Sequence, residues 1–182
     1  MTETLLVTIS GPDRPGVTTR LLEALAPSGF PVLDIEQVVI RGRLVLGLLL
    51  QTDDATDSDR KAAMESVSSA AAGMGLDCDT QLGSAERASK RPERLLVTVI
   101  GQPLCPAGLT AVAGAIAECG GNIDRIVRVA AYPVTALELD VSGANHDDLR
   151  HVLAQVASAS GVDLSVQRSG LTRRGSRLVV MD

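Results

Sequence analysis

The fold is decided by a stretch that occurs twice, Leu5-Leu6-Val7-Thr8-Ile9-Ser10-Gly11 and, 90 residues later, Leu95-Leu96-Val97-Thr98-Val99-Ile100-Gly101. The match continues with one small insertion, so that Pro15-Gly16-Val17 corresponds to Ala107-Gly108-Leu109 and Asp34-Ile35-Glu36 to Asn122-Ile123-Asp124. Self-similarity of this kind indicates copies of one structural unit. We therefore predict two small domains, at residues 1–83 and 94–169, joined by a polar linker at residues 84–93.

Each copy has the order β-α-β-β-α-β. In the first copy, β-rich apolar runs occupy 5–10, 32–40, 44–52 and 76–82, and the second helix starts with Asp57 as its N-cap. In the second copy the strands are 95–100, 122–131, 134–141 and 162–167, one helix turns Leu109, Val112, Ala113 and Ile116 inward, and Asn145 caps the other. The order predicts the α+β class, with two ferredoxin-like domains that each place two helices on one face of a four-stranded antiparallel sheet.

Composition excludes several classes of protein. Of the 182 residues, 45% are hydrophobic, no Trp is present, and Tyr132 and Phe30 are the only aromatic residues. The net charge of −5 and the lack of aromatic stacking platforms argue against a nucleic-acid binder. No apolar run is long enough to span a membrane, and the N-terminus does not resemble a signal peptide. Three widely spaced cysteines without a CxxC motif fit a reduced cytoplasm.

The loop Gly11–Val17 is the first candidate binding site. Gly16 leaves the backbone bare where the first helix begins, and a helix N-terminus offers free N–H groups to a carboxylate. Asp13 could pair with an ammonium group, so the loop suits the two ends of a free amino acid. A plain strand-to-helix turn with Asp13 as a cap accounts for the same residues.

The second copy offers weaker candidates. Its loop, residues 102–108, has no acidic residue and is less suited to a zwitterion. Asn122 starts a central strand, where its amide could read a hydroxyl or an amine or could simply shape a turn. The histidines have no neighbouring thiol or paired carboxylate, so the sequence predicts no complete metal site.

The C-terminal residues 170–182 belong to neither repeat. A basic connector leads into Arg177-Leu178-Val179-Val180-Met181-Asp182, which is typical of a buried strand. We predict that it is the first strand of a further domain that this chain lacks.

Together these residues carry a resemblance to a known family. The two copies, the Asp13-Arg14-Pro15-Gly16 loop and the RLVVMD ending resemble the tandem ACT region of bacterial phosphoserine phosphatases, whose catalytic domain is haloacid dehalogenase-like. The resemblance implies that Asp182 corresponds to the phosphorylated nucleophile, and that Mg²⁺ is held by the missing catalytic domain. The later motifs are absent, so we expect no phosphatase activity from these 182 residues alone and no cofactor in this chain.

The resemblance also implies a ligand and a partner. It implies that the ACT pair binds L-serine, with glycine as an alternative, and modulates dephosphorylation of O-phospho-L-serine in L-serine biosynthesis. The matching positions predict one ligand wall from Asp13, Arg14, Pro15, Gly16 and Val17, and a second from Asn122, Ile123 and Asp124, all in a cytoplasmic homodimer. An alternative is a stand-alone tandem-ACT regulator that resembles the glycine cleavage system transcriptional repressor and acts through a protein partner.

Overall fold

The computed structural model describes residues 1–85 and 94–169, which form two compact units. Unit 1 (residues 1–85) contains β1 (Thr2–Pro12), α1 (Val17–Leu25), the short 3₁₀ turn η1 (Ala26–Ser28), β2 (Val32–Ile40), β3 (Arg43–Gln51), α2 (Asp57–Gly73) and β4 (Asp77–Ala85). Unit 2 (residues 94–169) contains β5 (Arg94–Gly101), α3 (Pro106–Glu118), β6 (Asn122–Ala130), β7 (Thr135–Ser142), α4 (His146–Ser160) and β8 (Asp163–Arg168). The predicted terminal strand at 177–182 lies outside the described residues.

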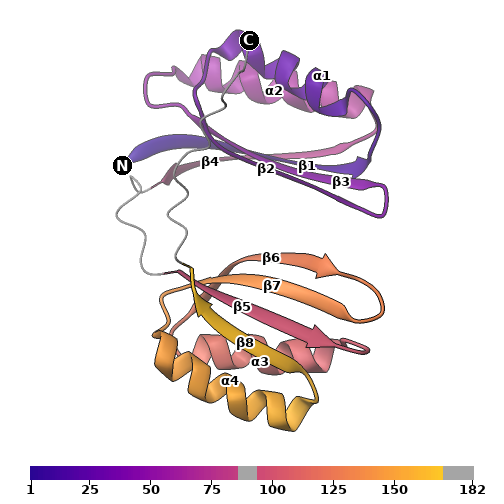
Figure 1. Ribbon diagram of the computed structural model, residues 1–182. Coiled ribbons are helices and arrows are strands. Elements are labelled where there is room, and N and C mark those ends of the chain that lie inside the picture. Colours follow the sequence, from indigo (N-terminus) through magenta and orange to yellow (C-terminus); the bar gives the residue numbers. More distant parts are fainter. Residues whose placement is uncertain (86–93, 170–182) are drawn as a thin grey trace, which may run out of the picture. The chain divides into compact units, whose positions relative to one another are not determined.

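Each unit is one antiparallel sheet covered by two helices. The strand orders are β2-β3-β1-β4 and β6-β7-β5-β8, so the repeat in the sequence is a repeat of topology. Figure 1 shows α1 and α2 on one face of the first sheet, and α3 and α4 on one face of the second. The structure therefore confirms the predicted ferredoxin-like arrangement in both copies.

The core of unit 1 follows from alternation along its two central strands. Residues Leu5 and Val7 of β1 pair with Leu50 and Leu48 of β3, and all four side chains are buried beneath the helices. The helices contribute Val17, Leu21, Leu25, Ala63, Val67 and Ala71 to this core. Burying each large aliphatic side chain stabilises the fold by about 1.5–3 kcal/mol, and Phe30 packs against this core only partly buried.

The helix starts are set by side-chain caps in α2 and α4. Thr56 caps α2 through a bond from the Asp59 N–H to its Oγ1, and the Asp59 carboxylate accepts the Thr56 N–H in return. The predicted cap, Asp57, is the first helical residue instead, because the threonine forms this reciprocal pair. The hydrogen bonds from Thr56 lower the pKa of Asp59. Asn145 caps α4 as predicted.

Two further differences concern element boundaries and faces. In α3 the buried alanine is Ala115, whereas Ala113, predicted to face inward, is exposed. Small residues fill most of this helix, so hydrophobicity alone does not single out one face. Strand β4 continues to Ala85, two residues beyond the predicted domain boundary, because it pairs with β1 as far as Thr2.

Candidate functional site

The loop between β1 and α1 is held by backbone hydrogen bonds at both ends. The N–H of Asp13 donates to the carbonyl of Gly42 at 2.8 Å, which fixes the loop to the β2–β3 hairpin. Gly16 is the N-cap of α1 with φ of 87°, a left-handed conformation that favours glycine. The loop therefore turns sharply into the helix at the residue that the sequence singles out.

A pocket of about 200 Å³ lies against this loop, and we call it the α1 pocket. Its lining residues are Arg14, Pro15, Gly16, Val17, Arg20, Gly73 and Met74. The volume is below the ~300–1,000 Å³ of pockets for drug-sized ligands, so it suits a small metabolite. Four of the five residues predicted for the first ligand wall are thus brought together, and Asp13 lies next to them without lining the pocket.

Sequence reasoning missed three lining residues. Arg20 is one turn into α1 from Gly16, so the helical period could have indicated it. Gly73 and Met74 come from the end of α2, where no local motif points to the loop. Only the packing of α1 against α2 places them there.

Arg14 connects the two segments that line the pocket, which are the loop before α1 and the end of α2. Its Nη2 donates to the carbonyl oxygen of Met74, which is the C-cap of α2. A cation at a helix C-terminus is favourable because the last carbonyl groups carry the negative end of the helix dipole. The arginine thereby positions the loop against α2 and leaves its other N–H groups for a ligand.

The electrostatics of the α1 pocket favour an anion. Both charged lining residues, Arg14 and Arg20, are cationic. Helix α1 has no side-chain cap and no acidic residue in its first turn, in contrast to α2 and α4. The pocket can therefore bind a carboxylate or a similar group at the N-terminus of α1.

The corresponding loop of unit 2 is built differently. Cys105 is the N-cap of α3 and Pro106 its first residue, so Gly108, the counterpart of Gly16, lies inside the helix. Gly108 is buried, and a Cβ there would lie 3.3 Å from Cγ1 of Val162. Gly108 therefore allows α3 to pack closely against Val162, whereas Gly16 adopts the left-handed conformation at which α1 begins.

The predicted second wall forms a polar cluster at the start of β6, which is an edge strand of its sheet and not the central strand predicted. Asn122 Nδ2 and Ser142 Oγ each donate to Asp124 Oδ1 at 2.9 Å, and Arg94 lies 3.7 Å from Asp124 Oδ2. Ile123 packs on the core of unit 2. Asn122 and Asp124 are brought together there, within unit 2, while the other predicted wall belongs to unit 1.

Asp182 lies outside the described residues. Among residues 1–85 and 94–169 no group of three or more His, Cys, Asp or Glu side chains could hold a metal ion. His146 instead contacts Asp147, with 2.8 Å between Nδ1 and Oδ1, which lowers the pKa of that carboxyl. None of the helices in the described ranges is long and apolar enough to cross a membrane.

Comparison with known proteins identifies the repeated unit. Family models of the ACT domain match residues 3–81 and residues 95–167. The chain is 46% identical over 180 residues to phosphoserine phosphatase of Streptomyces coelicolor, and 39% identical to phosphoserine phosphatase SerB2 of Mycobacterium tuberculosis. Each alignment covers 98% of this chain but only 43% and 44% of the relatives, so the chain spans less than half of their length.

Two solved structures share the fold. A protein of unknown function from Galdieria sulphuraria matches 92% of this chain and 99% of its own with a TM-score of 0.75 at 20% identity. A candidate glycine cleavage system transcriptional repressor matches 92% of this chain and 98% of its own with a TM-score of 0.71 at 16% identity. At these identities the likeness concerns the fold alone.

Proposed function

Because the chain belongs to the ACT-domain family and carries two of its domains, we propose that it is the amino-acid-sensing region of a phosphoserine phosphatase. The observation that carries the proposal is the 46% identity to the Streptomyces coelicolor enzyme across nearly the whole chain. That relative is more than twice as long as the aligned region, which leaves room for a catalytic domain. In this proposal the catalytic part holds Mg²⁺, and no described residue is assigned to the metal.

The ligand in this proposal is L-serine, bound in the α1 pocket. The N-terminus of α1 takes the carboxylate, and Asp13, next to the pocket, takes the ammonium group. Serine can modulate hydrolysis of O-phospho-L-serine only if it binds one arrangement of the whole protein better than another. What the ACT pair must supply is therefore a difference in its affinity for serine between these two arrangements.

The test is a thermal-shift panel of amino acids on the 182-residue chain. L-serine at ~100 times its dissociation constant should stabilise the chain by ~2.7 kcal/mol, while D-serine should not shift the midpoint. The same panel includes glycine, the alternative effector of the ACT pair. A response to glycine alone would favour that alternative, and no response to any amino acid would contradict amino-acid sensing.

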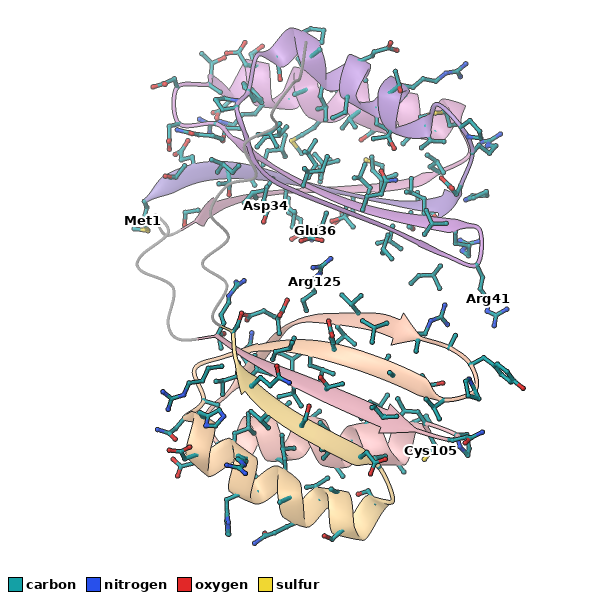
Figure 2. All side chains as sticks on the ribbon, in the orientation of Figure 1. Met1, Asp34, Glu36, Arg41, Cys105 and Arg125 are labelled. Carbon is teal, nitrogen blue, oxygen red and sulfur yellow. The ribbon has the colours of Figure 1, made fainter. Side chains whose placement is uncertain are left out.

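The proposal includes a homodimer formed through strand β2. This edge strand exposes between 44% and 60% of six apolar side chains, namely Val32, Leu33, Ile35, Val38, Val39 and Ile40. Figure 2 labels Asp34 and Glu36 on the same strand, on the sheet face opposite the helices. An exposed apolar edge strand can pair with a strand of another chain. In a dimer with two-fold symmetry, the same strand of each copy forms the interface.

Light scattering after size-exclusion chromatography should give twice the 18.9-kDa mass of one chain. Val38→Lys should yield monomers, because it places a charge on the pairing strand. Leu82→Lys is the matched control, since Leu82 is as exposed but lies on β4, at the other edge of the sheet. A monomeric wild-type chain would contradict the dimer.

A further inference from the structure

We propose that the α1 pocket prefers an amino acid with a second anionic group, a phosphate monoester such as O-phospho-L-serine, over the neutral zwitterion. The inference rests on the proposed function in one respect only, that an amino acid occupies this pocket. It adds that the site responds to the substrate class of the phosphatase as well as to its product.

The charge of the lining carries the inference. L-serine has no net charge, and its carboxylate alone satisfies the N-terminus of α1. With its ammonium group paired to Asp13, it offers no second anion to the two cationic lining residues, Arg14 and Arg20. A phosphate adds about 1.5–2 negative charges and three acceptor oxygens at neutral pH, which supplies that second anion.

The two arginines have donors to spare. Arg14 uses Nη2 for the carbonyl of Met74, and a guanidinium has further N–H groups in a planar fork that matches phosphate oxygens. Arg20 is exposed, and its guanidinium has no hydrogen bond or ion pair with any residue in the described ranges. An arginine that lines a pocket without a protein partner is available to a ligand anion.

The surroundings strengthen the positive potential. Arg41 and Arg43 flank Gly42 in the β2–β3 hairpin, and Figure 2 shows Arg41 at the tip of that hairpin. The hairpin contacts the loop directly, because the Gly42 carbonyl accepts the Asp13 N–H. Arg41 and Arg43 therefore add positive charge to the hairpin that contacts the loop.

The pocket also has space for the larger ligand. A Cβ built on Gly16 or on Gly73, both in the lining, would meet no atom within 4 Å. The open region therefore extends on both sides of the pocket, from the start of α1 to the end of α2. A phosphate extending from the serine hydroxyl position can use this space without displacing a side chain.

The experiment is calorimetric titration of the 182-residue chain with L-serine, O-phospho-L-serine and inorganic phosphate, at low and at high ionic strength. Phosphorus NMR of the mixture checks that the ester stays intact. We expect O-phospho-L-serine to bind about tenfold more tightly than L-serine at low salt, with the advantage shrinking at high salt. Inorganic phosphate should bind more weakly than the ester, since it lacks the amino-acid end.

Arg20→Gln should lower the roughly tenfold ratio of ester affinity to L-serine affinity to about one, because it removes a hydrogen-bond donor to the phosphate. The matched control is Arg150→Gln, which removes an arginine that is also exposed, from α4 in unit 2, and should leave both affinities unchanged.

The remaining outcomes decide between the two proposals. Serine binding as tightly as the ester, or an ester advantage that survives Arg20→Gln, would overturn this inference and leave serine sensing intact. Inorganic phosphate binding as tightly as the ester would overturn it in favour of a free-phosphate site. Failure of serine and of the ester to bind would overturn both proposals.

Discussion

Gly16→Ala is expected to abolish binding of L-serine while unit 1 stays folded. Gly16 caps α1 at φ of 87°, where a side chain costs about 1–2 kcal/mol. A Cβ at this position meets no atom within 4 Å, so the free protein suffers no clash. The added methyl group instead occupies the lining of the α1 pocket, where a ligand carboxylate would approach the helix N-terminus. Calorimetric titration should detect no serine binding.

Gly29→Ala separates the two effects of this substitution. Gly29 also has a left-handed φ, 66°, and a Cβ there also meets no atom within 4 Å. It does not line the α1 pocket, so Gly29→Ala should lower the melting midpoint as Gly16→Ala does and leave serine affinity unchanged. Asp13→Ala should abolish binding for a different reason, because it removes the partner of the ammonium group. Serine binding retained in both Gly16→Ala and Asp13→Ala would sink the assignment.

The predicted part of the site is the part that is local in sequence. A helix start with a bare glycine can be recognised from Gly11–Val17, because turn and cap chemistry depend on adjacent residues. The other side of the pocket comes from Met74, some 60 residues away, whose carbonyl accepts the Arg14 guanidinium. No periodicity encodes that contact, since it depends on how far α2 extends before its C-cap. Arg20 is predictable only in part, because helical spacing indicates which face of α1 it lies on but not which residues of α2 lie beside it.

The same reasoning explains which parts of the fold were predictable. Alternating apolar residues in β1 and β3 leave one choice of buried face, so the central strands follow from the sequence. Helix α3 has no such contrast, so its sequence predicts Ala113 in the core, whereas the structure buries Ala115. The start of α2 depends on which of two neighbouring residues, Thr56 or Asp57, forms the reciprocal hydrogen-bond pair. Geometry decides that competition, since both residue types are good caps.

Gly121→Ala is expected to destabilise unit 2 by about 1–3 kcal/mol, because no space exists for the methyl group. Its Cβ would lie 2.9 Å from Ile116 Cγ2, 3.0 Å from Ala144 Cβ and 3.0 Å from the Ile116 carbonyl oxygen. That carbonyl already accepts the N–H of Gly121 at 2.9 Å, so it cannot move away without loosening the end of α3. Both side chains belong to the buried core, so relief would have to come from shifting α3 against the loop before α4.

Gly114→Ala is expected to have the opposite effect on the stability of the same unit. Gly114 lies inside α3, and a Cβ there meets no atom within 4 Å, so alanine should stabilise unit 2 by about 0.5–1 kcal/mol. Urea unfolding monitored separately for the two units measures both variants, and the transition of unit 1 should stay in place. If Gly121→Ala unfolds within about 0.5 kcal/mol of wild type, the close approach of α3 to Gly121 is not required for stability. The two variants therefore test whether unit 2 needs a glycine at 121 for close packing, while the glycine at 114 only lowers the helix propensity of α3.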